Sequence, residues 1–341
     1  MNTIKERAAA IAAAAQKLNS AVYNASNDHG KITEARTVAQ QHSPKLVSLE
    51  EAIKQSGLKD GMTISFHHHF RGGDKVVNLV VGKLAEMGFK NLHLAASSLL
   101  DTHEPLIEHI KNGVITQIST SGLRGELARQ ISLGLIENPV VFRSHGGRGA
   151  AIAKGELHID VAFLGASSSD PLGNACGYSR SENAQSICGS LGYALPDAEY
   201  ADKVVILTDD LVNYPNTPAS ISERYVDYVV QVDSVGDSSK IASGAIRDTK
   251  NPRDILLAKQ AAKVIEHSGY LTPGFSIQTG SGGASLAVVK YLRNAMVEQN
   301  IKASFALGGI TAHMVKLHEE GLIERLIDVQ SFDKVAAESL K

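Results

Sequence analysis

The sequence has few cysteines, no excess of basic charge and no long apolar run, and each shortage excludes a class of protein. Two cysteines among 341 residues, Cys176 and Cys188, are too few for a secreted disulfide framework, so we expect a reducing, cytoplasmic location. Lys and Arg total 34 against 36 for Asp and Glu, which leaves no positive excess to bind nucleic acid. No apolar run approaches the roughly 20 residues that span a bilayer, so no membrane partner is expected.

Residues 1–45 are an alanine-rich segment that we predict to be helical. Lys5 and Arg7 precede an alanine run at 8–15, which superficially resembles the charged and apolar regions of a signal peptide. Alanine is only weakly apolar, however, and no small-residue cleavage site follows directly. Because alanine is the strongest helix former, a short solvated or docking helix is the better interpretation.

From about Leu58 onward, strand-like and helix-like patterns alternate, which is typical of an α/β fold with a mainly parallel sheet. The predicted strands are nearly unbroken apolar runs, as expected where both faces of a sheet are covered. They lie at 62–66, 92–96, 114–119, 159–164, 204–207 and 225–232. After the first strand, Val76, Val80, Leu84 and Met87 recur at helical spacing and predict an amphipathic helix.

The second half repeats the pattern that opens the first, which predicts two related, open, mainly parallel α/β domains. A strand, a polar loop ending in Gly-Gly, an amphipathic helix and a strand follow in this order from Ser65 and from Phe275. Any two strand–helix–strand units share such an order, so a coincidental match stays open. The stretch 236–252 is predicted as a linker between a first domain at 46–235 and a second at 253–341. The second domain is too short for a full copy, so we expect it to be incomplete.

The loop 67–73, HHHFRGG, follows the first predicted strand and is the strongest candidate site. Parallel sheets bind ligands beyond the carboxyl ends of their strands, where this loop lies. Cations or donors come from His67, His68, His69 and Arg71, and Gly72 and Gly73 let backbone N–H groups approach a ligand. We expect this loop to bind an anion such as a carboxylate, and not a metal ion. On a strand, His67 and His69 would share one face and His68 would point to the other. The sequence also has no nearby cysteine or second histidine-rich motif at metal-ligand spacing, so no metal site is predicted. A purely structural loop stays as the alternative.

Three further loops follow predicted strands and contain glycine. Gln278-Thr279-Gly280-Ser281-Gly282-Gly283 resembles a phosphate cradle, but it lacks the Lys-Ser/Thr pair of a nucleotide-hydrolysing loop. It occupies the same place in the second half as the histidine loop in the first. The loops 119–125 and 143–149 combine glycine with Arg124 and Arg148, whose planar guanidinium suits a carboxylate.

Several of these segments resemble the alpha chain family of citrate lyase, a branch of the coenzyme A transferase superfamily. The resemblance covers the chain from about Leu46 to its end, and the triple-histidine loop is specific to this branch. The segments that carry it are 60–74 (DGMTISFHHHFRGGD), 147–149 (GRG), 155–163 (GELHIDVAF), 170–174 (DPLGN), 189–198 (GSLGYALPDA) and 278–283 (QTGSGG). The resemblance implies a coenzyme A transferase-like fold.

The same resemblance implies a reaction, a carrier and partners. Citrate would replace acetate on the thioester of an acyl carrier protein, and a beta subunit would then cleave the citryl group. The chain itself would bind no cofactor, since the phosphopantetheine group belongs to the carrier, or gamma, subunit. Many relatives in the superfamily use a covalent glutamate in the second domain, whereas 278–283 contains no carboxylate. A ternary complex within an oligomeric assembly is therefore expected.

The resemblance also suggests a role for each candidate residue. Backbone N–H groups of Gly72, Gly73, Gly282 and Gly283 would stabilise the oxyanions. Citrate would be bound by Arg71 with His67, His68 and His69, and by Arg124 or Arg148. The carrier arm would contact Gln278, Gly280, Ser281, Gly282 and Gly283. Two alternatives stay open: a coenzyme A transferase for another small carboxylic acid, and a non-catalytic ligand-binding domain.

Overall fold

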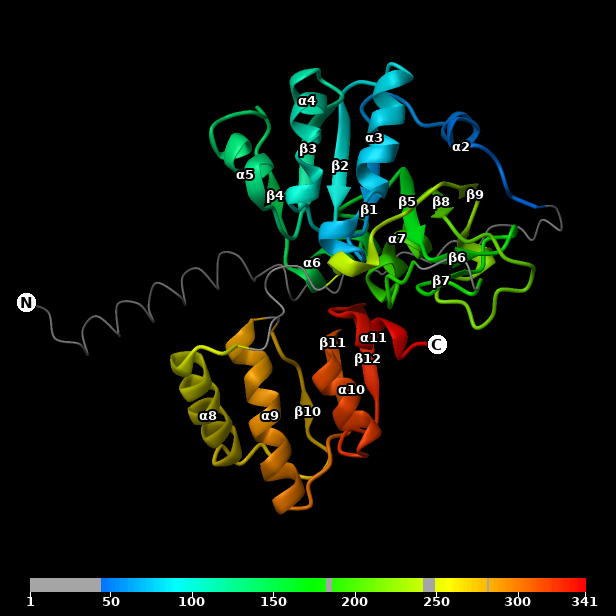
Figure 1. The fold of residues 1–341 in the computed structure, drawn as a ribbon. Coiled ribbons are helices and arrows are strands. Elements are labelled where there is room, and N and C mark those ends of the chain that lie inside the picture. Colours follow the sequence, from blue (N-terminus) through cyan, green and yellow to red (C-terminus); the bar gives the residue numbers. More distant parts are fainter. Residues whose placement is uncertain (1–43, 182–185, 242–248, 281) are drawn as a thin grey trace, which may run out of the picture.

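A computed structural model describes residues 44–181, 186–241, 249–280 and 282–341 (Figure 1). The larger lobe is built on a seven-stranded sheet in which every recorded strand pair is parallel, in the order β4-β3-β2-β1-β5-β8-β9. Its strands are β1 (Thr63–Phe66), β2 (Leu92–Ala96), β3 (Ile115–Thr120), β4 (Val141–Phe142), β5 (Val161–Ala166), β8 (Lys203–Thr208) and β9 (Tyr228–Gln231). The predicted parallel α/β fold is confirmed.

Helices cover this sheet, and local sequence explains where they begin and end. They are α2 (Leu49–Ser56), α3 (Val76–Glu86), α4 (Leu106–Lys111), α5 (Gly125–Ser132), α6 (His145–Ala153) and α7 (Leu195–Tyr200). In α2, the Ser48 side chain accepts from the N–H of Glu51, and Gly57 ends the helix in the left-handed region at φ 73°. The apolar stripe predicted for α3 is confirmed at Val76, Val80 and Leu84, which are all buried, whereas Met87 follows the last helical residue and is half-buried.

The predicted strand at 225–232 is shorter in the structure. Glu223–Tyr225 forms a 3-10 turn, so β9 begins only at Tyr228. A small antiparallel pair, β6 (Ser168–Ser169) and β7 (Ala175–Cys176), follows β5. The aromatic and branched residues at 225 and 226 are buried but outside the ladder, so apolar character alone placed the boundary wrongly.

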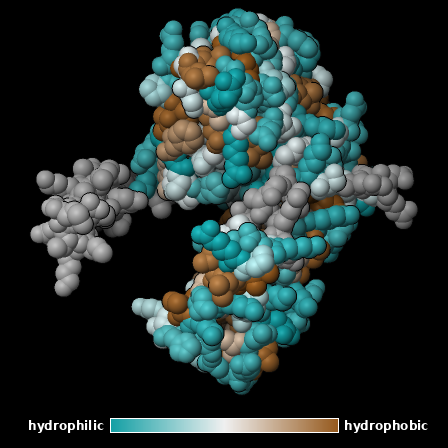
Figure 2. Space-filling model, turned by 60° about the vertical axis from the view of Figure 1, so that its left-hand side comes forward, coloured by the Kyte–Doolittle hydropathy of each residue, from teal (hydrophilic) through white to brown (hydrophobic). Residues whose placement is uncertain are grey.

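The smaller lobe contains a three-stranded parallel sheet, β10 (Ser276–Ile277), β11 (Phe305–Ile310) and β12 (Leu326–Ser331), in that order. Its helices are α8 (Pro252–Glu266), α9 (Gly283–Glu298), α10 (Ala312–Glu319) and α11 (Lys334–Glu338). The connection β10–α9–β11 has the same order as β1–α3–β2, and both strand pairs are parallel. On the face drawn in Figure 2, hydrophilic side chains predominate with apolar ones between them. Leu256, Leu257 and Val264 of α8 are exposed.

The two lobes meet at the carboxyl edges of their sheets, as the strand arrows of Figure 1 show for the larger lobe. Gln330 Nε2, on β12, donates to the carbonyl of His68 at 2.9 Å. The N–H of Ser190 donates to Ser331 Oγ at 3.2 Å, and Ser190 Oγ donates to the carbonyl of Asp328. Strand β12 therefore lies against the loop that follows β1 and against the segment around Ser190.

The predicted helix at 1–45 lies almost wholly outside the described residues. Of the predicted linker, residues 236–241 pack on the larger lobe, where Gly236 bridges to Asp74 and Ile241 is fully buried. Within the described residues, none of the helices has the length and apolar character needed to cross a membrane.

Candidate functional site

The chain leaves β1 through three histidines that point in two directions. The rings of His67 and His69 share one face, with centroids 3.8 Å apart, and both side chains are buried. Neither ring nitrogen of His69 has a hydrogen-bond partner among the described residues. His68 points the other way: its Nδ1 contacts Ser97 Oγ, and the rings of His145 and Tyr193 lie 6.1 Å from its ring.

Burial decides the protonation of these histidines. It lowers the pKa of His67 to about 4, and it lowers the pKa values of His68 and His69 well below the ordinary value of 6.5. All three rings are therefore neutral at pH 7. The expectation that they supply positive charge is wrong. At His67, desolvation outweighs the carboxylates of Asp74 and Asp197, whereas at His68 and His69 the neighbouring charges lower the pKa further.

Arg71 supplies the cation that the histidines do not. Its side chain is only 9% exposed, its Nε is buried without a hydrogen bond, and it forms no ion pair with any described carboxylate. Burial, and then the charge of Arg124, lower its pKa. The guanidinium lies 4.9 Å from the ring centroid of Phe332, which follows β12. A largely buried cation without a counter-ion among the described residues is costly, which indicates a place for an anion.

The backbone of Arg71 adds to this cost. Its φ is 52°, in the left-handed region that side chains with a Cβ rarely adopt, and such a residue costs about 1–3 kcal/mol. The 3-10 turn that it begins, Arg71–Gly73, is closed by a 2.9 Å bond from the N–H of Gly73 to the carbonyl of Phe70. The turn therefore holds the guanidinium at the junction of the lobes.

The other two arginines separate into different classes. Arg124 precedes α5, is exposed, and has no ion pair within the described part of the chain. Arg148 is 2% exposed, and both its terminal nitrogens donate to the carboxylate of Asp197 at 2.7 Å. One of them also donates to the carbonyl of Ala95 at 3.0 Å. The prediction that Arg148 is available to a substrate is wrong, because its charge is already paired.

Of the four candidate glycines, Gly72 lies inside the 3-10 turn Arg71–Gly73, and the other three differ in what their backbones can do. A Cβ on Gly73 would lie 2.2 Å from the carbonyl oxygen of Asp237, so only glycine fits, but its N–H is committed to Phe70. This commitment contradicts the predicted oxyanion role of Gly73. Gly282 caps α9 and Gly283 begins it, so their N–H groups stand at a helix N-terminus.

Of the remaining loop residues, Gln278 and Gly280 are exposed, and Ser281 lies outside the described residues. The loop follows β10, at the same sheet edge as Phe332. The recorded contacts of the smaller lobe with the histidine loop come from β12 and Phe332 rather than from this loop.

Sequence reasoning missed several residues around Arg71 and His68. Ser97 could have been found, because it directly follows the predicted strand at 92–96. Tyr193 lies in the segment 189–198, which carried the family resemblance but no predicted role. Its hydroxyl is 3.2 Å from Ser121 Oγ and donates to the carbonyl of His145 at 2.8 Å. Gln330 and Phe332 carried no recognisable signal.

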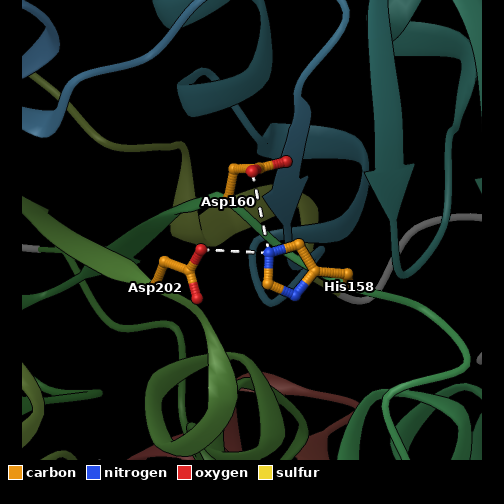
Figure 3. Close-up of side chains that lie close together, drawn as sticks. All are labelled: His158, Asp160 and Asp202. Carbon is orange, nitrogen blue, oxygen red and sulfur yellow. Dashed lines mark hydrogen bonds and ion pairs between the residues drawn. The ribbon is translucent and has the colours of Figure 1, made fainter.

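One group of described side chains could hold a metal ion, but it lies away from this site. His158, Asp160 and Asp202 place ligand atoms within 4.8 Å of one another (Figure 3). They precede β5 and β8, so they stand at the amino edge of the sheet, opposite the histidine loop. His158 and Asp202 are 59% and 60% exposed and form an ion pair at 3.0 Å. We assign the group no role in the candidate site.

The sequence comparisons with known proteins agree on one family. The sequence model of the citrate lyase alpha subunit family matches residues 43–341. The citrate lyase alpha chain of Haemophilus influenzae is 64% identical over 293 residues, which cover 86% of this chain and 58% of that protein. The crystal structure of a Streptococcus mutans citrate lyase alpha subunit in complex with citrate has 56% identity and a TM-score of 0.85. It is matched over 91% of this chain and 61% of that one.

A more distant structure supports the fold alone. The 4-hydroxybutyrate CoA-transferase of Porphyromonas gingivalis has 13% identity and a TM-score of 0.50, over 87% of this chain and 64% of that one. Across these comparisons, the chain spans roughly three fifths of the length of the proteins that it resembles.

Proposed function

Because the chain belongs to the citrate lyase alpha-subunit family, we propose that it exchanges acetate for citrate on the thioester of an acyl carrier protein. A citrate carboxylate attacks the acetyl carbonyl, the C–S bond breaks, and a mixed anhydride and a thiolate result. The thiolate then attacks the citryl carbonyl, the anhydride C–O bond breaks, and acetate leaves. Atoms and charge balance without an oxidant or a metal.

The observation that carries this proposal is the buried side chain of Arg71, which has no ion pair within the described part of the chain. Citrate carries about three negative charges near neutral pH, and an anion beside Arg71 would offset the desolvation of that buried cation. Exposed Arg124, whose charge acts on Arg71, is the second cation for a ligand with several carboxylates. A relative from Streptococcus mutans has been crystallised with citrate, which supports the same choice of ligand.

The absence of a carboxylate in the loop 278–283 supports direct exchange within a ternary complex. A covalent route would need an Asp or Glu there to accept the acyl group. The phosphopantetheine arm of a gamma subunit would present the thioester, close to Gln278, Gly280, Ser281, Gly282 and Gly283. A beta subunit would cleave the citryl product. Gly72, Gly282 and Gly283 are the backbone donors proposed for the oxyanions.

Calorimetric titration of the whole chain with citrate tests the ligand. Arg71→Gln should weaken citrate binding by about 100-fold, since it removes a charge-assisted contact of roughly 3 kcal/mol. Arg129→Gln is the matched control, because Arg129 is exposed on α5 and pairs with Glu126. Equal affinities for Arg71→Gln and the wild type would refute the assignment.

Thioester exchange with acetyl-coenzyme A as surrogate donor tests the reaction. Exchange with citrate, but not with 4-hydroxybutyrate, is expected. Preference for another acid would favour a different coenzyme A transferase. Citrate binding without exchange by the chain and its partner subunits would favour a ligand-binding domain.

A further inference from the structure

His68 and Ser97 form a hydrogen-bonded pair at the ends of two neighbouring strands. His68 follows β1 and Ser97 follows β2, and these strands pair in parallel up to Phe66 and Ala96. Ser97 is fully buried, and its Oγ contacts Nδ1 of His68. The smaller lobe holds the backbone of His68 through Gln330. The larger lobe therefore holds the imidazole of His68, and the smaller lobe holds its backbone.

The surroundings of Ser97 decide where the ring proton lies. Nδ1 of His68 is the only recorded hydrogen-bond partner of Ser97 Oγ among the described residues. If Nδ1 carried the proton and donated it, the buried hydroxyl would have no acceptor for its own hydrogen, which costs about 1–3 kcal/mol. Donation from Ser97 to Nδ1 satisfies both groups. The ring proton then lies on Nε2.

The charges around His68 keep the ring neutral. Burial lowers its pKa most, followed by Arg71, His145, His67 and His103, and no carboxylate is among these neighbours. A protonated ring would repel Arg71 directly. The ring nitrogens of His67 and His69 are enclosed and have no hydrogen-bond partner among the described residues, whereas Nε2 of His68 is not enclosed. It is therefore the histidine nitrogen of the loop that a ligand can reach.

We propose that His68 is a neutral hydrogen-bond donor that uses its Nε2–H to hold a carboxylate oxygen of the acid bound by Arg71, with Ser97 as its positioning residue. The inference rests on the proposed function and gives a specific atom to carboxylate recognition. It also assigns a side-chain donor to the loop in which the N–H of Gly73 is already used. A neutral donor adds directionality without a second buried charge.

Nitrogen-15 NMR of histidine-labelled protein tests the ring state. Two-bond proton–nitrogen correlations distinguish the two neutral tautomers. The imidazole signals that are absent from the spectrum of His68→Gln are those of His68. We expect the Nε2–H form from pH 6 to 8, and a shift of its signals when citrate is added. Ser97→Ala should convert part of the population to the Nδ1–H form. A wild-type Nδ1–H tautomer, or a protonated ring at pH 7, would overturn the proposal.

Two substitutions separate the ring nitrogens by geometry. The amide of His68→Gln reaches the position of Nε2, whereas that of His68→Asn replaces Nδ1. His68→Gln should bind citrate within about threefold of the wild type, and His68→Asn should lose about tenfold or more, the value of one hydrogen bond to a charged group. Equal affinities of the two variants would contradict the proposal.

Ser97→Ala should also lose about tenfold in citrate affinity, and Ser97→Thr should restore it. Ser119→Ala is the matched control, because Ser119 Oγ bonds a different histidine, His93, at 2.9 Å within the sheet. A wild type that binds no citrate would refute the proposed function and with it the ligand assigned to His68. Citrate binding that His68→Asn leaves intact would refute this inference alone.

Discussion

The pairing of Arg148 with Asp197 predicts that Arg148→Met destabilises the larger lobe without changing the anion site. The pair joins α6 to α7, and Arg148 also bonds the carbonyl of Ala95 on β2. Removing the guanidinium leaves a carboxylate that is 0% exposed, and breaking such a pair costs about 3–5 kcal/mol. With an m-value of about 3 kcal/mol/M, the urea midpoint should fall by roughly 1 M or more.

The assay is urea unfolding followed by far-ultraviolet circular dichroism, because the chain has no tryptophan for fluorescence. The double variant Arg148→Met/Asp197→Leu removes both charges and should recover most of the loss, as replaced buried pairs often do. Citrate affinity of the folded single variant should stay within about threefold of the wild type, which is under 1 kcal/mol. Unchanged stability together with lost citrate binding would refute the structural role of Arg148.

Three further predictions follow from the same region. Gly73→Ala should lower the free energy of unfolding by about 1–3 kcal/mol in thermal or urea unfolding, because the new Cβ meets the carbonyl of Asp237 at 2.2 Å; an unchanged value would contradict this close approach. The pKa of His67 is about 4 in the folded protein and 6.5 in the unfolded chain. Its contribution to the free energy of unfolding is therefore complete above pH 6.5 and is lost as the pH falls to 4. Between pH 6.5 and 4, the free energy of unfolding of the wild type should fall by up to about 3 kcal/mol more than that of His67→Leu. If the free energies of the two proteins changed in parallel with pH, this prediction would be refuted. Phe332→Leu removes the ring that lies against the guanidinium of Arg71, a contact worth about 1 kcal/mol. Phenylglyoxal should then modify Arg71 severalfold faster than in the wild type, and an unchanged rate would show that the ring does not cover the guanidinium.

Much of the fold could be predicted because its signals are local. The strand at 92–96 and the buried stripe of α3 depend on hydrophobic periodicity within a few residues, and both are confirmed. Tyr225 shows the limit of this reasoning, since an apolar residue can be buried in a turn as well as in a strand. The smaller lobe is confirmed as a parallel sheet with the predicted strand after Gly274.

The sequence placed the histidine loop after a strand, and the structure has it directly after β1, but the charge state of its side chains could not be predicted in the same way. Residue type identified His67 and Arg148 as cations, and neither is available as one. Arg71, from the same loop, forms no ion pair with any carboxylate in the ranges that the structure describes. The difference lies in the neighbours of each side chain, which the order of residues along the chain does not show.

Local sequence thus determines the strands, the helices and the loops that stand at the carboxyl edge, because backbone geometry repeats over short distances. Tertiary structure decides charge and access, because burial and pairing depend on residues far apart in the chain. Arg148 is neutralised by a carboxylate 49 residues away, and His68 is held by an amide 262 residues away. Arg71, by contrast, is a buried arginine that forms no ion pair with any described carboxylate, and the proposed acid would bind beside it.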